Sequence, residues 1–333
     1  MTRLYLIRHA EAEGNIYRIA HGHHNGLITN DRGYRQIDAL RERFRDVPID
    51  AVYASDLYRT QITAQAIWLP KALPLHLDPA FREIRLGVWE DQTWQELQNR
   101  YPEEMDHFSS RLDLWRAEGA ETAQQLVDRF VPALRRVAEA HDGGTVAVFS
   151  HGAALRIVLG VLQGLSLAEV GTRPHGDNTA VSLLTWENGA FRVEYRDDNS
   201  HLAERGLSTF ATQTWWQDGR MKDQGSEYRP LPETERGRFG VPAGDEATGI
   251  WYGDALIGAF SFRREADGLR LTRYILAPEW RGKRLGVPPM GQVLRYCRHQ
   301  ELPWLRLTCA DRALRLFFAR LGFVAAVGDE MVK

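Results

Sequence analysis

Two histidines, each at the end of a short apolar run, are the residues of this chain best placed to do chemistry. Residues 4–7 are followed by Arg8 and His9, and the largely apolar residues 146–150 are followed by His151. Runs of this length, closed by polar residues, are typical of buried parallel strands. Functional residues in open α/β sheets gather at the carboxyl ends of such strands. We therefore expect both histidines and the arginine to share one crevice.

This combination suits phosphoryl transfer. A neutral imidazole held in one orientation is a good nucleophile toward phosphorus, and its attack on a phosphate monoester gives a phosphohistidine that water can hydrolyse. The phosphoryl oxygens repel nucleophiles, so donors must be fixed around them. The cationic candidates are Arg8, Arg59 and His151, and Asn15 is a candidate amide donor in the first loop. Glu83 is the carboxyl that we expect to protonate the leaving alkoxide.

Two arginines, Arg82 and Arg85, flank this proton donor closely. A cation facing Glu83 would oppose its protonation, which proton donation requires. We therefore expect both arginines to point elsewhere, toward the substrate.

Composition excludes several classes of protein. The chain has 333 residues, enough for two domains, and its formal net charge of -2 gives no global attraction to nucleic acid or an anionic membrane. Its two cysteines, Cys297 and Cys309, suggest neither a disulfide framework nor a zinc site, which fits a reducing cytosol. We expect no secretory leader and no membrane helix, because no run approaches the roughly 18 apolar residues required. The expected protein is cytoplasmic and acts on a small phosphorylated metabolite, and a homodimer is left open.

The first two hundred residues alternate strand and helix patterns. This alternation predicts an α/β domain with a mostly parallel sheet and helices on its faces. The amphipathic stretch over residues 120–141 is the strongest helix pattern, although Pro132 lies inside it. Strands are expected at residues 3–7, 51–54 and 145–149, helices at 31–44, 58–68, 120–141 and 153–162, and a hairpin over 180–195.

The pattern dissolves after the hairpin and returns near residue 250. We interpret residues 206–248 as a linker with an irregular approach to a second domain, in which Trp215 and Trp216 indicate some packing. Residues 249–333 predict a smaller α+β domain. Its strands are expected at residues 250–252, 255–262, 269–276 and 304–308, and its helices at 287–298 and after Asp311.

The N-terminal motifs, in their order along the chain, resemble those of the histidine phosphatase superfamily, in its phosphoglycerate-mutase-like branch. They are Arg8-His9-Ala10-Glu11 with Asn15, Ser55-Asp56-Leu57-Tyr58-Arg59-Thr60, Glu83 followed by Gly87-Val88-Trp89-Glu90, and Ser150-His151-Gly152. The resemblance implies a three-layer α/β/α domain over residues 1–205. It also implies a phosphorylated nucleophile at His9, a proton donor at Glu83, a phosphate pocket of Arg8, Arg59 and His151, and no metal.

Two residues depart from the family pattern, Ala10 and Asp91, each at a position where glycine is usual. Both are small changes beside the pocket. The compact domain favours a phosphatase over a mutase, which remains the alternative. The loops that would set the substrate, at residues 16–28 and 90–118, are generic. The nearby His21, His23 and His24 have no carboxylate partner in the sequence and are interpreted as loop residues rather than as a metal site.

A basic, glycine-containing turn between a strand and a helix suits a pyrophosphate, because backbone amides and the helix N-terminus face it. Such a turn lies at residues 281–286, and with residues 274–280 and 311–323 it resembles a GNAT N-acetyltransferase over residues 248–325. The resemblance implies an acetyl-CoA pyrophosphate at Arg281, Gly282, Lys283 and Gly286.

The second domain also departs from its family. Arg284 stands where the family turn has glycine, and Phe318 stands where many members have the tyrosine that protonates the thiolate. Three alternatives therefore stay open for this domain. It is an acetyltransferase in a bifunctional enzyme, an acyl-CoA-binding sensor, or a degenerate module used for packing, dimerisation or substrate shaping.

Overall fold

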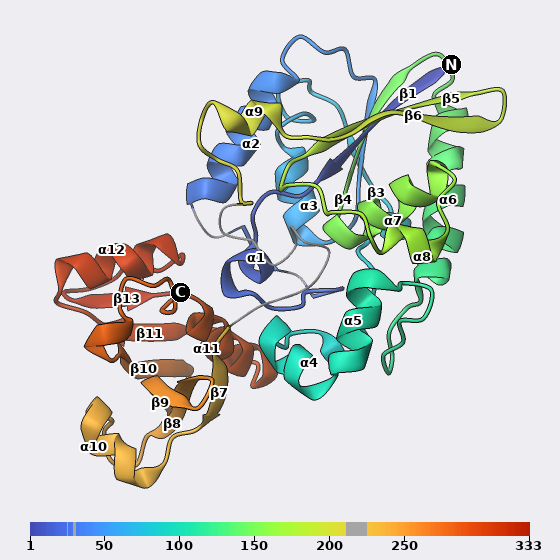
Figure 1. The fold of residues 1–333 in the computed structure, drawn as a ribbon. Coiled ribbons are helices and arrows are strands. Elements are labelled where there is room, and N and C mark those ends of the chain that lie inside the picture. The colour runs from blue at the N-terminus through green and yellow to red at the C-terminus, as the bar shows by residue number, and fades with distance from the viewer. Residues whose placement is uncertain (25, 29–30, 211–224) are drawn as a thin grey trace. The chain divides into compact units, whose positions relative to one another are not determined.

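The structure is a computed structural model that describes residues 1–24, 26–28, 31–210 and 225–333 (Figure 1). The chain divides into two compact units. The first unit comprises Met1–Asn15, Ala20–Gln92 and Leu97–Lys222, and the second comprises Ile16–Ile19, Thr93–Glu96 and Asp223–Lys333. Among the described residues, none of the helices is both long enough and apolar enough to span a bilayer.

The first unit is built on a six-stranded sheet in the order β3-β2-β4-β1-β5-β6. The strands β3, β2, β4 and β1 run parallel, and β5 and β6 form an antiparallel hairpin at one edge. The expected mostly parallel sheet is confirmed. The strands are β1 (Thr2–Arg8), β2 (Ala51–Ala54), β3 (Leu75–Leu77), β4 (Thr145–Ser150), β5 (Val181–Glu187) and β6 (Ala190–Asp198).

Helices cover both faces of this sheet and give the expected three layers. Alternate residues of a strand point to opposite faces. Figure 1 shows α2 (Asp31–Arg43) and α6 (Ala123–Ala140) on opposite sides of the sheet. Ile7 packs with Ile37 and Leu40 of α2 on one face, whereas Thr2 donates its hydroxyl to the carbonyl of Ala138 in α6 on the other. The helices and helical turns are α1 (Glu13–Tyr17), α2 (Asp31–Arg43), α3 (Tyr58–Ala64), η1 (Pro79–Phe81), η2 (Gly87–Trp89), α4 (Trp94–Arg100), α5 (Pro102–Ser110), α6 (Ala123–Ala140), α7 (Gly152–Leu162), α8 (Leu167–Val170) and α9 (Ser200–Ala203).

Local signals explain where the helices differ from expectation. Helix α6 begins at Ala123 rather than at residue 120, because Thr122 and Gln125 form a capping box. Helix α3 ends at Ala64, and the chain continues in turns whose backbone N–H groups bond three residues back, as from Ile67 to Ala64. Neither shift moves the residues that follow the strands.

The second unit contains a seven-stranded sheet in the order β12-β13-β11-β10-β9-β8-β7. Its strands are β7 (Glu227–Pro230), β8 (Glu246–Tyr252), β9 (Ala255–Glu265), β10 (Gly268–Leu276), β11 (Leu305–Thr308), β12 (Val324–Ala325) and β13 (Glu330–Val332). Its helices and helical turns are η4 (Glu233–Glu235), α10 (Arg236–Phe239), η5 (Pro278–Trp280), α11 (Pro288–His299) and α12 (Arg312–Arg320). The expected sheet-rich second domain is confirmed.

One stretch expected to be linker is part of this sheet. Strand β7 pairs antiparallel with β8, with Tyr228 opposite Ile250, and η4 and α10 follow it. A four-residue edge strand with partly exposed side chains carries too little hydrophobic alternation to stand out in a sequence. The tryptophans Trp215 and Trp216 lie outside the described residues.

The core of the second unit includes a short segment from early in the chain. Tyr17 and Ile19 are fully buried there, in one cluster with Met290 and Phe318. A side chain at Gly291 would place its Cβ 2.6 Å from the Cβ of Tyr17, so glycine is required at that point of α11.

Candidate active site

Strand register brings the candidate residues of the first unit to one edge of the sheet. Arg8 lies opposite Ser150 in the parallel pair β1–β4, and the backbone N–H of His9 donates to the carbonyl of Ser150 at 3.0 Å. Ser55 follows β2 in the same way, donating to the carbonyl of Phe149 at 3.0 Å. His9 and His151 therefore leave neighbouring strands side by side, with ring centroids 5.3 Å apart.

His9 is buried as a neutral imidazole in a defined tautomer. Its Nδ1 lies 2.7 Å from the carbonyl oxygen of Ala10, and a carbonyl only accepts, so Nδ1 carries the hydrogen. Burial, with the nearby cations Arg59 and Arg8, holds the pKa of His9 well below its usual 6.5. The lone pair of Nε2 is therefore available as a nucleophile at neutral pH.

Arg8 carries a buried donor that a bound anion could satisfy. Its Nη1 donates to the carbonyl of Gly176 at 2.6 Å, but its Nε is buried and has no hydrogen-bond partner among the described residues. A Cβ at Gly152 would lie 3.0 Å from this Nε, so the glycine lets the guanidinium approach the chain after His151. Burial lowers the pKa of Arg8, and an anion would offset the cost of that desolvation.

His151 is held by two side chains that fix its protonation. Nε of Arg59 donates to Nδ1 of His151 at 3.1 Å, and Nε2 of His151 lies 2.9 Å from the hydroxyl of Ser55. Because Nδ1 accepts, the ring is neutral and its hydrogen is on Nε2. Burial and Arg59 lower the pKa of His151 well below 6.5. The sequence predicted a cation here, whereas the structure shows a neutral donor.

Arg59 also holds the loop that contains the three histidines. Its Nη1 donates to the carbonyl of His24 at 2.6 Å and its Nη2 to that of Gly22 at 2.8 Å, and burial lowers its pKa to about 10. His23 donates from Nε2 to the carbonyl of Glu83 at 2.8 Å. In the part of the chain that the structure describes, no three His, Cys, Asp or Glu side chains are grouped to hold a metal.

Asn15 is oriented by a residue that the sequence analysis did not single out. Its Oδ1 accepts from the backbone of Ala12 at 3.1 Å and from Nδ2 of Asn178 at 3.3 Å, so the opposite end of the amide, Nδ2, is its donor. Nδ2 of Asn178 also donates to the carbonyl of His9 at 3.0 Å. An Asp177-Asn178 pair a few residues before β5 gives only a weak sequence signal.

Glu83 contacts the residues that directly follow His151. Its carboxylate accepts from the backbone of Ala153 at 3.1 Å and Ala154 at 2.7 Å, in the first turn of α7, and from its neighbour Ile84 at 3.0 Å. Helix α7 begins directly after His151, so the start of this helix holds the Glu83 carboxylate close to His151 in the chain. Carboxylates are stabilised at helix N-termini.

Arg82 points away from Glu83, as expected, because it pairs with a different carboxylate. Its Nε and Nη2 bond the two oxygens of Asp56 at 2.6 and 2.5 Å, and this bidentate pair lowers the pKa of Asp56. A contact of Arg82 or Arg85 with substrate stays a prediction.

The basic turn of the second unit provides fewer amide donors than the sequence suggested. Pro288 and Pro289 occupy the first positions of α11 and have no N–H, and Arg284 adopts a left-handed φ of 62°. The two basic residues of the expected site contact their own unit: Arg281 donates from Nε to the carbonyl of Leu276 at 3.0 Å, and the Lys283 amine lies 4.8 Å from the ring centroid of Trp280. Of the two glycines, Gly286 accepts from the hydroxyl of Tyr274 at 2.7 Å, and Gly282 has a φ of 74°.

Two family models match the chain. The model of the histidine phosphatase superfamily (branch 1) matches residues 4–199, and that of the acetyltransferase (GNAT) family matches residues 209–323. The two matches fall on the two sheets described above and bear out both resemblances seen in the sequence.

The chain is also similar to individual proteins over its first part. The metal-independent phosphoserine phosphatase of Arabidopsis thaliana is 31% identical over 62% of this chain and 86% of that protein. Phosphoglycerate mutase-like protein 4 of the same plant is 32% identical over 62% and 89% of the two chains. The solved structure of YhfR from Bacillus stearothermophilus is 28% identical, with a TM-score of 0.58, and covers 61% of this chain and 100% of its own.

Proposed function

The chain belongs to the histidine phosphatase superfamily, and we propose that its first unit hydrolyses a small phosphomonoester through a phosphohistidine on His9. One observation carries the proposal. His9 is a buried, neutral imidazole whose Nδ1 is committed to the carbonyl of Ala10, beside the unsatisfied Nε of Arg8. A nucleophile with its reactive nitrogen unprotonated and an adjacent buried anion donor suits attack on phosphorus.

The first step transfers the phosphoryl group to the enzyme. Nε2 of His9 attacks phosphorus, the phosphorus–oxygen bond of the ester breaks, and the leaving alkoxide takes a proton from the carboxyl of Glu83. In the structure Oε1 of Glu83 accepts two N–H bonds and Oε2 accepts one, so Oε2 retains a lone pair that can carry the proton.

The second step returns the enzyme to its starting state. The Glu83 carboxylate takes a proton from water, the resulting hydroxide attacks the phosphohistidine, and the phosphorus–nitrogen bond breaks to release inorganic phosphate. In both steps Arg8, Arg59 and the amide of Asn15 are the donors toward the phosphoryl oxygens, with the neutral ring of His151, whose Nε2–H faces Ser55, beside them. Donors fixed in a buried site stabilise the charge that develops there.

A phosphatase and a mutase share this chemistry and differ in what removes the phosphoryl group. The two plant relatives are named for a phosphoserine phosphatase and a mutase-like protein. We favour hydrolysis and propose phosphoserine as the first metabolite to test. A mutase would instead require a bisphosphate primer and would keep the phosphoenzyme in the absence of an acceptor.

For the second unit, we propose the degenerate module among the alternatives, rather than acetyl transfer. An acyl-CoA pyrophosphate would rely on amides at the start of α11, where two successive prolines lack them. Phe318 is buried against Tyr274 and Phe323 and has no hydroxyl to protonate a thiolate. The residues therefore fit acetyl-CoA poorly, and no step is assigned to it.

The test uses the full chain with p-nitrophenyl phosphate and phosphoserine, with and without a chelator. We expect hydrolysis that survives the chelator, an acid-labile phosphoryl label on His9 during turnover, and loss of both in His9→Ala. His76→Ala, which changes an exposed histidine of β3, is the matched control and keeps activity. Hydrolysis by the purified His9→Ala variant, or a label on another residue, would overturn the proposal.

A further inference from the structure

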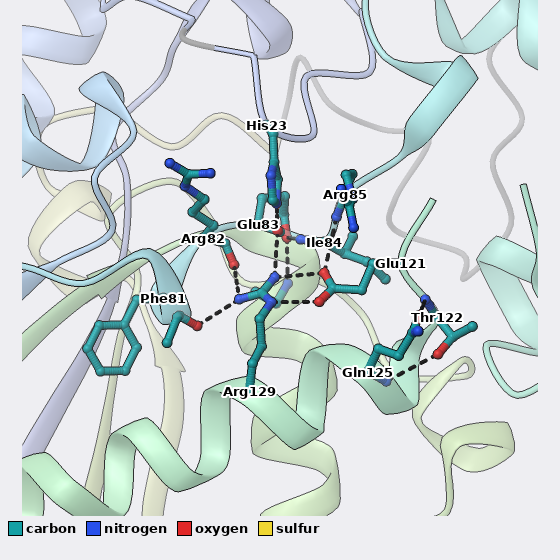
Figure 2. Close-up of polar contacts among 12 residues, drawn as sticks. His23, Phe81, Arg82, Glu83, Ile84, Arg85, Glu121, Thr122, Gln125 and Arg129 are labelled. Carbon is teal, nitrogen blue, oxygen red and sulfur yellow. Dashed lines mark hydrogen bonds and ion pairs between the residues drawn. The ribbon is translucent and has the colours of Figure 1, made fainter. Parts of the chain in front are cut away.

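An arginine from α6, Arg129, reaches the segment that carries the proposed proton donor. Figure 2 shows its guanidinium pointing at backbone carbonyls of that segment. Nη1 donates to the carbonyls of Ala80 at 2.7 Å and Arg82 at 3.1 Å, and Nη2 donates to the carbonyl of Glu83 at 2.8 Å. One side chain thus binds a carbonyl of η1 and two carbonyls of the residues that follow it, which form neither helix nor strand.

The guanidinium is itself fixed by a carboxylate. Glu121 accepts from Nε of Arg129 at 2.6 Å and from Nη2 at 2.8 Å, as the dashed lines in Figure 2 show. The side chain of Glu121 is 10% exposed and that of Arg129 is 23% exposed. A bidentate pair with this little exposure is geometrically specific and weakly screened. Glu121 also bonds Arg85, just beyond the proposed proton donor: the backbone N–H of Glu121 donates to the carbonyl of Arg85 at 2.9 Å, and the backbone N–H of Arg85 donates to Oε2 of Glu121 at 3.3 Å.

Glu83 is consequently held at both ends. Its carbonyl accepts from Arg129 and from Nε2 of His23, and its carboxylate accepts from the start of α7. Loss of the carbonyl contacts would free the backbone while leaving the helix start unchanged. A displacement of about 1 Å at a catalytic group can cost about 10²-fold in rate.

We propose that Arg129, fixed by Glu121, is a positioning residue for proton donation by Glu83. The inference rests on the proposed function of the first unit. Because Arg129 acts on the proton donor and not on the phosphate pocket, its loss should matter most where the leaving group needs a proton. It should matter little where the leaving group departs readily without one.

The experiment compares phenyl phosphate, which has a poor leaving group, with p-nitrophenyl phosphate, which has a good one. We expect Arg129→Gln to lower kcat for phenyl phosphate at least about tenfold more than for p-nitrophenyl phosphate, in line with the 10²–10⁴-fold value of a general acid. Glu83→Gln should show the same split, and the double variant should add nothing to it. Arg129→Lys should recover part of the loss, because it restores one charged donor.

The matched control is Arg135→Gln on the same helix, an exposed arginine that lies over the ring of Trp186 and should leave both rates unchanged. If Arg129→Gln does not fold, His23→Ala removes the other donor to the Glu83 carbonyl and should give a smaller split of the same sign. Equal slowing of both esters in folded variants would overturn the positioning role while leaving the phosphatase proposal intact. A wild-type chain that hydrolyses neither ester would overturn both.

Discussion

Nε of Arg59 donates to Nδ1 of His151 at 3.1 Å, and this single bond decides the charge of the pocket. A nitrogen that accepts from a guanidinium cannot carry its own hydrogen, so His151 is neutral and presents Nε2–H. In the proposed phosphate pocket the positive charge then comes from Arg8 and Arg59. A cationic His151 would place three positive groups in a buried site before any anion arrives, at a high desolvation cost.

The buried histidines of the pocket should stay neutral at a pH where exposed histidines are protonated. The pKa values of His9 and His151 are both lowered well below 6.5, so as the pH falls through about 6.5 their neutral forms persist. Nitrogen-15 NMR of the free protein should show both rings neutral at about pH 6. Titration of His9 at or above pH 6.5 would contradict the neutral nucleophile.

Asn178 should act on catalysis through Asn15. Nδ2 of Asn178 fixes Oδ1 of Asn15 at 3.3 Å, so Asn178→Ala frees the amide to turn. We expect about a tenfold fall in kcat/KM for Asn178→Ala and for Asn15→Ala, less than the about 10²–10³-fold cost of removing an oxyanion-hole donor, because Arg8 and Arg59 remain in place. In the double variant the losses should not add, because both act on one amide.

Asn99→Ala, on the exposed side of α4, is the control and should change nothing. The measurement is a double-mutant cycle on p-nitrophenyl phosphate. Losses that add in full would show that Asn178 works independently of Asn15.

The sequence predicted where the strands end, but it did not predict the hydrogen bonds between side chains that follow different strands. The runs before His9 and His151 identified β1 and β4, and parallel register then brings the two histidines together without further information. The neutral state of His151 depends on a bond from Arg59, 92 residues away, and the orientation of Asn15 depends on a residue 163 positions later. Such pairings follow from packing, which leaves no local pattern.

The same reasoning explains the other differences. Arg82 was expected to turn away from Glu83 because cations oppose proton donation, and its pairing with Asp56 confirms the direction. Arg129 drew no attention because an arginine on an amphipathic helix normally indicates a solvated face. Its inward orientation is seen only in the structure, in its bonds to the carbonyls of Ala80, Arg82 and Glu83.

Gly87 should be far less replaceable than Gly164, although both have positive φ. The two angles are 59° and 84°, but a Cβ at Gly87 would lie 2.1 Å from the carbonyl oxygen of Glu118, whereas at Gly164 nothing lies within 4 Å. Gly164→Ala should cost about 1 kcal/mol for the left-handed backbone. Gly87→Ala should cost about 3 kcal/mol or more, because backbone must also move.

Scanning calorimetry of the two variants measures this difference. For a unit of this size, about 1 kcal/mol lowers Tm by about 2–4 °C, so Gly87→Ala should lose several degrees more than Gly164→Ala. Equal Tm losses would mean that the chain near Glu118 yields without cost and that only the backbone angle matters.

Acetyl-CoA should fail to bind the full chain. The start of α11 lacks the N–H groups of Pro288 and Pro289, and the turn before it has Arg284 at a left-handed φ. Calorimetric titration should therefore give no saturable heat at ligand concentrations up to about 1 mM, the range of a −4 kcal/mol interaction. Saturable binding in the micromolar range would reinstate the acyl-CoA sensor, and transfer of the acetyl group to an amine would reinstate the bifunctional enzyme.

A variant with Arg284→Gly, Pro288→Ala and Pro289→Ala tests whether missing backbone donors explain the absence of binding. The variant regains two backbone N–H donors and a flexible turn. If missing donors prevent binding, its affinity for acetyl-CoA should exceed that of the natural chain.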